Sequence, residues 1–122
     1  MIPERRSIKQ MEVDVIRATL DRAKVRNIDP DAVASLTSLN VISRCECGCA
    51  SIDFEAHRST HRSKPIGDGI GKTERGGQVG IIVWGYQDAI TGLEIYDLGT
   101  GDEGLSLPVP TSIMPWEKSG KG

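Results

Sequence analysis

The feature that most constrains the fold is a change of phase in an alternating pattern on the two sides of Gly48. Residues 41–47 carry small or apolar side chains at odd positions, and residues 52–56 carry apolar side chains at even positions. Successive side chains of a strand point to opposite faces, so one regular strand cannot bury both sets together. A bulge or sharp bend at residues 48–50 would give both sets a common interior, because glycine tolerates the backbone conformations that such a bend uses.

Two helices are expected before this segment. Residues 10–26 repeat apolar side chains with the 3.6-residue period of an amphipathic helix. Pro30 disfavours helix at the residue before it and suits the first position of a new helix, whose free N–H groups Asp29 can cap. This second helix carries a short apolar stripe and should end near Leu39.

The rest of the chain indicates strands and loops. Residues 79–86 are apolar almost throughout and predict a central strand that is buried on both faces or nearly so. Residues 88–92 are turn-like, and the alternating residues 93–98 should pair with the central strand as a hairpin. Little apolar content and five glycines predict a long mobile loop over residues 57–78. Glycines and prolines predict an extended C-terminal tail over residues 99–122. The side chains that can anchor this tail are Leu107, Val109, Ile113, Met114 and Trp116.

These elements predict a single α+β domain over residues 1–122, with two N-terminal helices packed on a mainly antiparallel β-sheet. A chain of 122 residues is long enough to bury a core without disulfides. No helix is expected between strands after Leu39, which argues against a doubly wound nucleotide-binding fold.

Charge and hydropathy exclude two classes of partner. The chain has 15 Lys and Arg against 17 Asp and Glu, a formal net charge of -2, whereas nucleic-acid-binding domains are usually strongly basic. No apolar run approaches the ~20 residues of a membrane helix, and the N-terminus lacks the apolar stretch of a signal peptide. We therefore expect a cytoplasmic protein that binds neither nucleic acid nor membrane.

The C-terminal third is acidic and contains the candidate binding residues. Residues 81–122 hold six acidic side chains and two basic ones. The candidates are Glu94, Tyr96, Asp97, Asp102 and Glu103, with Trp84 and Tyr86 near them. Carboxylates beside aromatic rings suit recognition of a protein with a basic surface, although they could also simply solvate an exposed strand. The leading hypothesis is a non-catalytic domain that binds such a protein, in an immunity-type or regulatory role.

The three cysteines form the most specific chemical cluster. Cys45, Cys47 and Cys49 could hold zinc with an imidazole from His57 or His61. Sulfurs bound to one zinc ion lie about 3.8 Å apart, whereas alternate positions of a regular strand lie roughly 6.6 Å apart, so the site needs a bend. Small side chains packed beneath a helix are the competing interpretation. A zinc-binding domain is the first alternative function, and a cysteine-dependent enzyme, with a histidine activating a thiol, is the second. No other cofactor is expected.

Residues 45–51 read Cys-Glu-Cys-Gly-Cys-Ala-Ser. This run resembles a Cys-x-Cys-Gly-Cys-x-Ser segment that precedes a strand in small uncharacterised bacterial proteins. A later run in those proteins is similar to residues 91–96. The resemblance implies an α+β fold and carries no established activity. Some small acidic bacterial domains of this shape are immunity proteins, which is an analogy of type only.

Residues 67–73 read Gly-Asp-Gly-Ile-Gly-Lys-Thr and end like a phosphate-binding loop. The first glycine of that motif would fall at Ile66, and neither a strand before the run nor a helix after it is expected. A flexible loop is therefore the preferred interpretation of this run.

Overall fold

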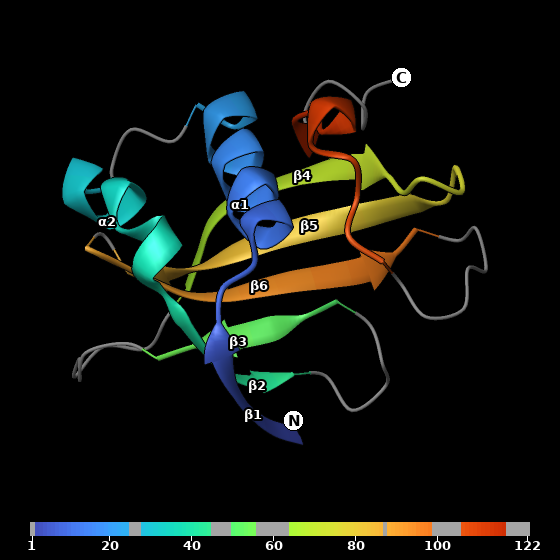
Figure 1. Ribbon diagram of the computed structural model, residues 1–122. Helices are drawn as coiled ribbons and strands as arrows, with labels where there is room; N and C mark the ends of the chain where they lie inside the picture. The colour runs from blue at the N-terminus through green and yellow to red at the C-terminus, as the bar shows by residue number, and fades with distance from the viewer. Residues whose placement is uncertain are drawn as a thin grey trace.

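One antiparallel sheet of six strands, with helices on one of its faces, is built by the described part of the chain (Figure 1). The computed structural model describes residues 2–24, 28–44, 50–55, 64–86, 88–98 and 106–116. The elements in chain order are β1 (Ile2–Ser7), α1 (Gln10–Arg22), α2 (Pro30–Ala34), the 3-10 turn η1 (Leu36–Ser38), β2 (Asn40–Arg44), β3 (Ile52–Phe54), β4 (Lys64–Lys72), β5 (Gln78–Tyr86), β6 (Ala89–Asp97) and the 3-10 turn η2 (Pro110–Ser112). The strands lie in the order β1-β2-β3-β6-β5-β4.

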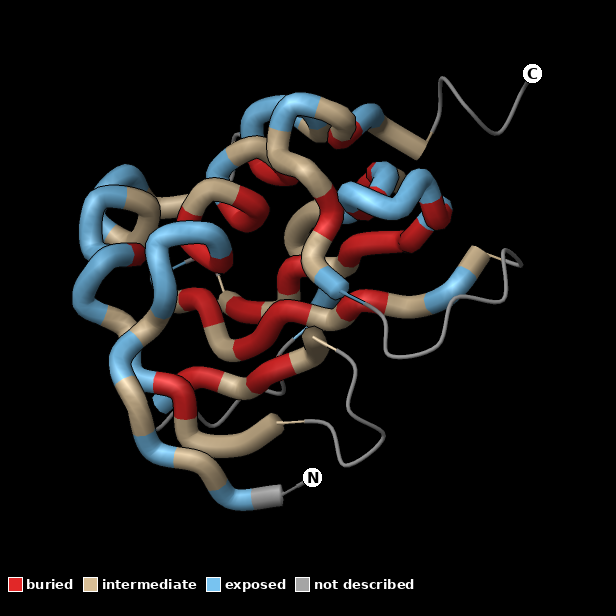
Figure 2. Tube along the Cα trace, turned by 45° about the vertical axis from the view of Figure 1, so that its right-hand side comes forward, coloured by how far each residue is buried: buried red, intermediate tan, exposed pale blue. Residues whose placement is uncertain are grey.

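The hydrophobic core lies between the sheet and α1. Figure 2 shows the buried segments along α1 and the central strands. The core residues are Val13, Val15, Ile16, Leu20, Leu36, Val41, Ile52, Phe54, Val79, Ile81, Val83, Ile90, Leu93, Ile95 and Ile113. Nearly all are aliphatic, and the residues from α1 follow the helical period while those from the strands alternate. The mixed α and β content and the antiparallel sheet agree with the expected α+β class.

The two expected helices differ in what they contribute. α1 lies over β4 and β5 and buries the apolar side of the helix, as predicted (Figure 1). It ends at Arg22, four residues before the expected end. α2 begins as predicted, with the Asp29 carboxylate accepting a hydrogen bond from the backbone nitrogen of Asp31 at 3.0 Å. However, α2 has only five residues and none of them is buried, so the expectation of a second helix packed on the sheet is wrong.

The phase change has a simple structural origin. β2 and β3 are separate antiparallel strands, with Val41 opposite Phe54 and Arg44 opposite Ile52. As predicted, the two alternating runs do not form one strand. The reversal of chain direction between β2 and β3 puts Val41, Ile52 and Phe54 in the same core. A register shift in β2, between Val41 and Ser43, adds to this. Most of the bend predicted at residues 48–50 lies outside the described residues.

The predicted loop over residues 57–78 is wrong for residues 64–72, which form β4. The glycines of this strand, Gly67, Gly69 and Gly71, lie opposite core residues of β5 and so face the helices. Glycine is usually rare inside strands, which is why the pattern predicts a loop. Here the missing side chains leave room for the C-terminal segment to pack directly on β4. A strand also replaces the loop that a phosphate-binding motif would need.

The hairpin of β5 and β6 is confirmed, with two corrections. β6 begins at Ala89, so most of the predicted turn over residues 88–92 is strand. Burial of β5 on both faces is wrong for Ile82, Trp84 and Tyr86, which are only partly buried. Their face of the sheet points away from α1, and no described element covers it.

The C-terminal segment is more ordered than the extended tail that the sequence predicts. Its described part, residues 106–116, runs past α1 and along the free edge of β4 (Figure 1). Ile113 anchors it in the core, as expected, with 1% of its surface exposed. Met114 was also expected to be an anchor, but its side chain is exposed because only its backbone pairs with Ile70.

Candidate binding face

The sheet surface that points away from α1 holds the largest group of candidate binding residues. We call this surface the open face and define it by Asp53, Asp68, Ile82, Trp84, Glu94 and Tyr96. Their common orientation follows from the register and from the alternation along each strand. The residues next to them in the sequence lie on the core side, so their own side chains point away from the core. No described helix or turn covers the open face.

Two carboxylates stand on either side of one aliphatic residue. Ile82 on β5 lies directly opposite Glu94 on β6 and directly opposite Asp68 on β4. Neighbouring strands are about 4.8 Å apart, so the two acidic residues are separated by two strand spacings. Asp53 on β3 lies directly opposite Gly92 of β6 and adds a third carboxylate. Within the described residues, none of these three carboxylates forms an ion pair, which leaves the open face negative.

Hydrogen bonds hold two of the carboxylates in place. The indole Nε1 of Trp84 donates to Glu94 Oε1 at 3.0 Å, and the hydroxyl of Ser43 donates to Asp53 Oδ2 at 3.0 Å. Neither donor carries a charge, so neither hydrogen bond is an ion pair. Trp84 and Glu94 are thereby fixed relative to each other on a rigid hairpin.

Tyr96 forms the other end of the open face. Its ring lies over Gly80, its direct partner on β5, and fills the space that a side chain at residue 80 would occupy. Burial raises the pKa of the Tyr96 phenol, and the negative charges of Asp68 and Glu94 raise it further. A hydrogen bond from Trp116 lowers it in part. The phenol is therefore neutral at physiological pH and close to two carboxylates.

The structure divides the acidic and aromatic residues predicted from the sequence. Glu94 and Tyr96 both lie on the open face. Asp97 lies opposite Val79, whose side chain is in the core, so Asp97 belongs to the other side of the sheet, at the end of β6. Asp102 and Glu103 lie outside the described residues.

Asp68 and Trp116 are the site residues that the sequence analysis missed. Asp68 sits in the glycine-rich run that predicts a loop, and alternation of glycine with other residues was the available indication of a strand. Trp116 was expected only as an anchor of the tail. Its contact with Tyr96 joins two residues that are twenty positions apart in the sequence.

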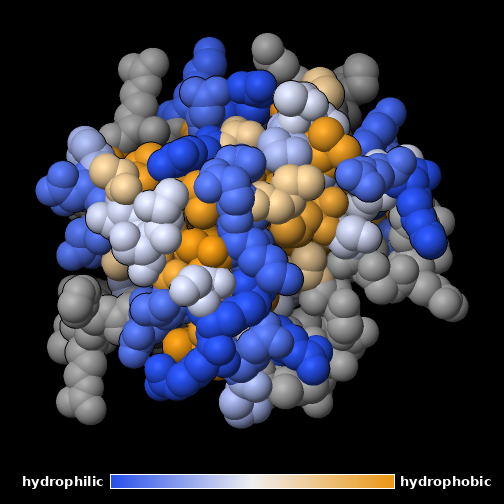
Figure 3. Space-filling view, in the orientation of Figure 1, coloured by the Kyte–Doolittle hydropathy of each residue, from blue (hydrophilic) through white to orange (hydrophobic). Residues whose placement is uncertain are grey.

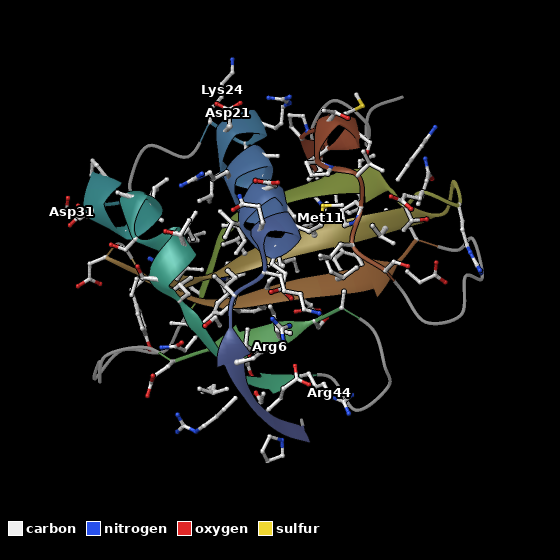
Figure 4. The ribbon with its side chains drawn as sticks, in the orientation of Figure 1. Arg6, Met11, Asp21, Lys24, Asp31 and Arg44 are labelled. Carbon is white, nitrogen blue, oxygen red and sulfur yellow. The ribbon has the colours of Figure 1, made fainter. Side chains whose placement is uncertain are left out.

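A second charged cluster lies on the helix side of the sheet, around Arg6 (Figure 4). The guanidinium of Arg6 donates to both carboxylate oxygens of buried Glu12, at 2.9 and 2.7 Å, and its Nε donates to Glu4 at 2.8 Å. Arg44 pairs with the other oxygen of Glu4 at 3.1 Å. These hydrogen bonds, to Glu12 first, raise the pKa of Arg6. The charges of this cluster are neutralised internally, so it fixes β1 to α1 and is no candidate binding site.

The helix side offers a more polar surface. Viewed from that side, hydrophilic residues cover most of the surface, and apolar residues show between α1 and the segments beside it (Figure 3). Met11 on α1 is an exposed large hydrophobic residue here, whereas Met114 pairs with Ile70 at the edge of β4. The described helix side shows no combination of carboxylates and aromatic rings like that of the open face.

The zinc candidates cannot be placed in the structure. Cys45, Cys47, Cys49, His57 and His61 all lie outside the described residues. In the rest of the chain, as far as it is described, no three His, Cys, Asp or Glu side chains are grouped as a metal site requires. The zinc hypothesis therefore stays a prediction from the sequence.

The described helices are all too short or too polar to cross a membrane. Comparison of the chain with protein-family models, with curated proteins and with solved structures finds no match.

Proposed function

We propose that this chain is a non-catalytic binding domain whose open face docks a protein with a basic surface. One observation carries the proposal. Three carboxylates, from Asp53, Asp68 and Glu94, share a sheet face with partly exposed aromatic and aliphatic side chains, and no basic residue of the described chain pairs with them.

The composition of the open face supports binding more than simple solvation. A solvated face of an antiparallel sheet usually carries polar side chains at alternate positions. Here Ile82, Trp84 and Tyr96 occupy such positions and are only partly buried. Tryptophan and tyrosine are enriched at protein interfaces, where they supply contact area and a polar end. The open face therefore combines apolar contact area with negative charge.

Charge complementarity indicates the class of partner. Uncompensated carboxylates favour the approach of a positively charged surface and disfavour an acidic one. The strands that present them are held by a regular ladder, so little conformational freedom is lost on binding. A regulatory or immunity-type role in the cytoplasm is the concrete form of the proposal, because both act by covering a partner's surface.

Nuclear magnetic resonance titration tests the proposal directly. The probes are an arginine-rich peptide and a glutamate-rich peptide of equal length. We expect the arginine-rich peptide to shift the Trp84 indole signal and the amides of Glu94 and Tyr96, with an affinity that falls as salt is added. The glutamate-rich peptide should shift none of them.

Two double variants, each of which removes two negative charges, distinguish binding at the open face from general electrostatic attraction. Asp68→Asn with Glu94→Gln removes two charges from the open face and keeps hydrogen-bond acceptors. Asp21→Asn with Asp31→Asn removes two charges from the exposed helix side (Figure 4). We expect only the first pair to weaken binding. Equal weakening by both pairs, or shifts confined to the helix side, would overturn the proposal.

A further inference from the structure

We infer that Trp116 is a partner-binding residue of the open face and that, together with Tyr96, it receives an arginine side chain of the partner. The inference rests on the proposed function and specifies the chemistry of one end of the same surface. Its basis is the path of the C-terminal segment, residues 106–116, which we call the strap.

The strap is seated in the core on the helix side of β4. Pro108 and Ile113 are both buried. They pack so closely on β4 that a Cβ atom at Gly71 would lie 2.8 Å from the Cβ of Pro108 and 3.3 Å from a side-chain carbon of Ile113. A Cβ atom at Gly69 would lie 2.8 Å from the carbonyl oxygen of Met114. Real atoms do not pack this closely, so the fit depends on glycine at both positions.

Hydrogen bonds attach the strap to the outer edge of β4. Ile70 and Met114 exchange two backbone hydrogen bonds of 2.9 and 2.8 Å. The hydroxyl of Ser112 accepts from the backbone nitrogen of Lys72 at 2.9 Å, and the nitrogen of Val109 donates to the carbonyl oxygen of Lys72 at 2.8 Å. The strap thus replaces a neighbouring strand at Ile70 and Lys72, the C-terminal end of this edge. It is a fixed part of the fold.

This attachment carries the chain from one face of the sheet to the other. Ile113 lies on the helix side, and Met114 lies at the edge beside Ile70. Two residues later, the indole of Trp116 donates a hydrogen bond to the hydroxyl of Tyr96, whose ring is on the open face. Both side chains are partly exposed. The strap therefore adds a second ring to the Tyr96 end of the open face.

Arginine is the side chain that this end suits best. Two aromatic rings stand together there, with the carboxylates of Asp68 and Glu94 close enough to act on the Tyr96 phenol. A guanidinium stacks on aromatic rings and pairs with carboxylates through a planar set of donors. The ammonium of lysine is more strongly hydrated and lacks the planar shape. The Tyr96 and Trp116 end should therefore distinguish arginine from lysine.

The test compares an arginine-rich with a lysine-rich peptide of equal length and spacing by calorimetric titration. We expect the wild-type protein to bind the arginine-rich peptide about tenfold more tightly than the lysine-rich peptide. This is the difference in affinity that a single aromatic anchor commonly makes. Trp116→Phe keeps a ring and should retain most of the preference. Trp116→Leu keeps apolar bulk without a ring and should remove it. Thr111→Ala, at an exposed position of η2, which lies beside α1, should leave it unchanged.

The amide signals of Ile70 and Lys72 report whether the strap stays docked in each variant, so a loss of binding through misfolding is recognised. If Trp116→Phe and Trp116→Leu bind both peptides as the wild type does, the inference is wrong and the proposed function stands. Loss of the arginine preference in Thr111→Ala alone also contradicts it. If the wild-type protein binds neither basic peptide on the open face, the inference and the proposed function both fail.

Discussion

The ring of Tyr96 lies across the backbone of Gly80, the residue directly opposite it on the neighbouring strand. Gly80→Ala would place a methyl group inside the ring, so the ring must move. We expect a loss of about 1–3 kcal/mol in the free energy of unfolding, the usual cost of overpacking, measured by urea denaturation. In a Tyr96→Ala background the same change should cost much less. Equal costs in the two backgrounds would show that the ring is elsewhere.

Tyr96 also predicts how stability changes at high pH. Burial raises the pKa of its phenol in the folded protein above the value in the unfolded chain. The folded state then holds the proton to a higher pH, so this contribution to stability is complete below the ordinary tyrosine pKa and is lost as pH rises through the folded value. Urea midpoints of Tyr96→Phe should fall less steeply in this range than those of the wild type, and equal slopes for the two proteins would contradict the explanation.

The C-terminus of α1 contains a strained residue. Lys24 has a φ of 54°, in the left-handed region that costs about 1 kcal/mol for residues other than glycine. Its side chain projects away from the sheet into solvent (Figure 4). We expect Lys24→Gly to raise the free energy of unfolding by about 0.5–1 kcal/mol, as glycine does at this position of many helices. Lys24→Ala removes the charge and keeps the strain, so a similar gain there would refute the explanation.

The ion pair of Arg6 and Glu12 should be one of the more important polar contacts for stability. Glu12 is buried, and its Oε1 also accepts a hydrogen bond from the backbone nitrogen of Lys9 at 2.8 Å. Glu12→Ala would leave the partly buried Arg6 without this partner, and we expect a loss of about 3 kcal/mol in unfolding experiments. Glu55→Ala, which removes the exposed and distant partner of Arg5, should change stability by less than about 0.5 kcal/mol. Comparable losses would contradict the difference in burial.

Chelation distinguishes the proposed binding domain from the zinc alternative. The described core is aliphatic, so we expect the thermal midpoint of protein purified without an affinity tag to be the same with and without a chelator. Metal analysis should find no stoichiometric zinc. Stoichiometric zinc whose removal unfolds the protein would instead favour the site at the three cysteines.

Much of the sheet could be predicted because its central hairpin is strongly apolar. The alternation around Leu93 and the apolar run of β5 are sufficient to identify both strands. β4 could not be recognised, because its helix-facing positions are glycines and their purpose appears only when the strap is in place. β1 was missed as well, since Glu4 and Arg6 give it a charged pattern that only Glu12 and Arg44 explain.

The candidate site was predictable only along single strands. Alternation places Glu94 and Tyr96 on one face of β6, and the structure agrees. That Asp68 belongs beside them depends on the strand order, which no local pattern contains. The role of Trp116 depends on the strap crossing the edge of β4, a contact between distant parts of the chain.

The strap has one more consequence, for how copies of this protein meet in a crowded solution. A strand at the margin of a sheet is a template on which another molecule can add its own backbone, and growth of this kind leads to aggregates. Ser112 and Met114 occupy the groups of Lys72 and Ile70 that would start such growth. The strap that brings Trp116 to the binding surface thus also closes this part of the β4 edge to neighbouring molecules.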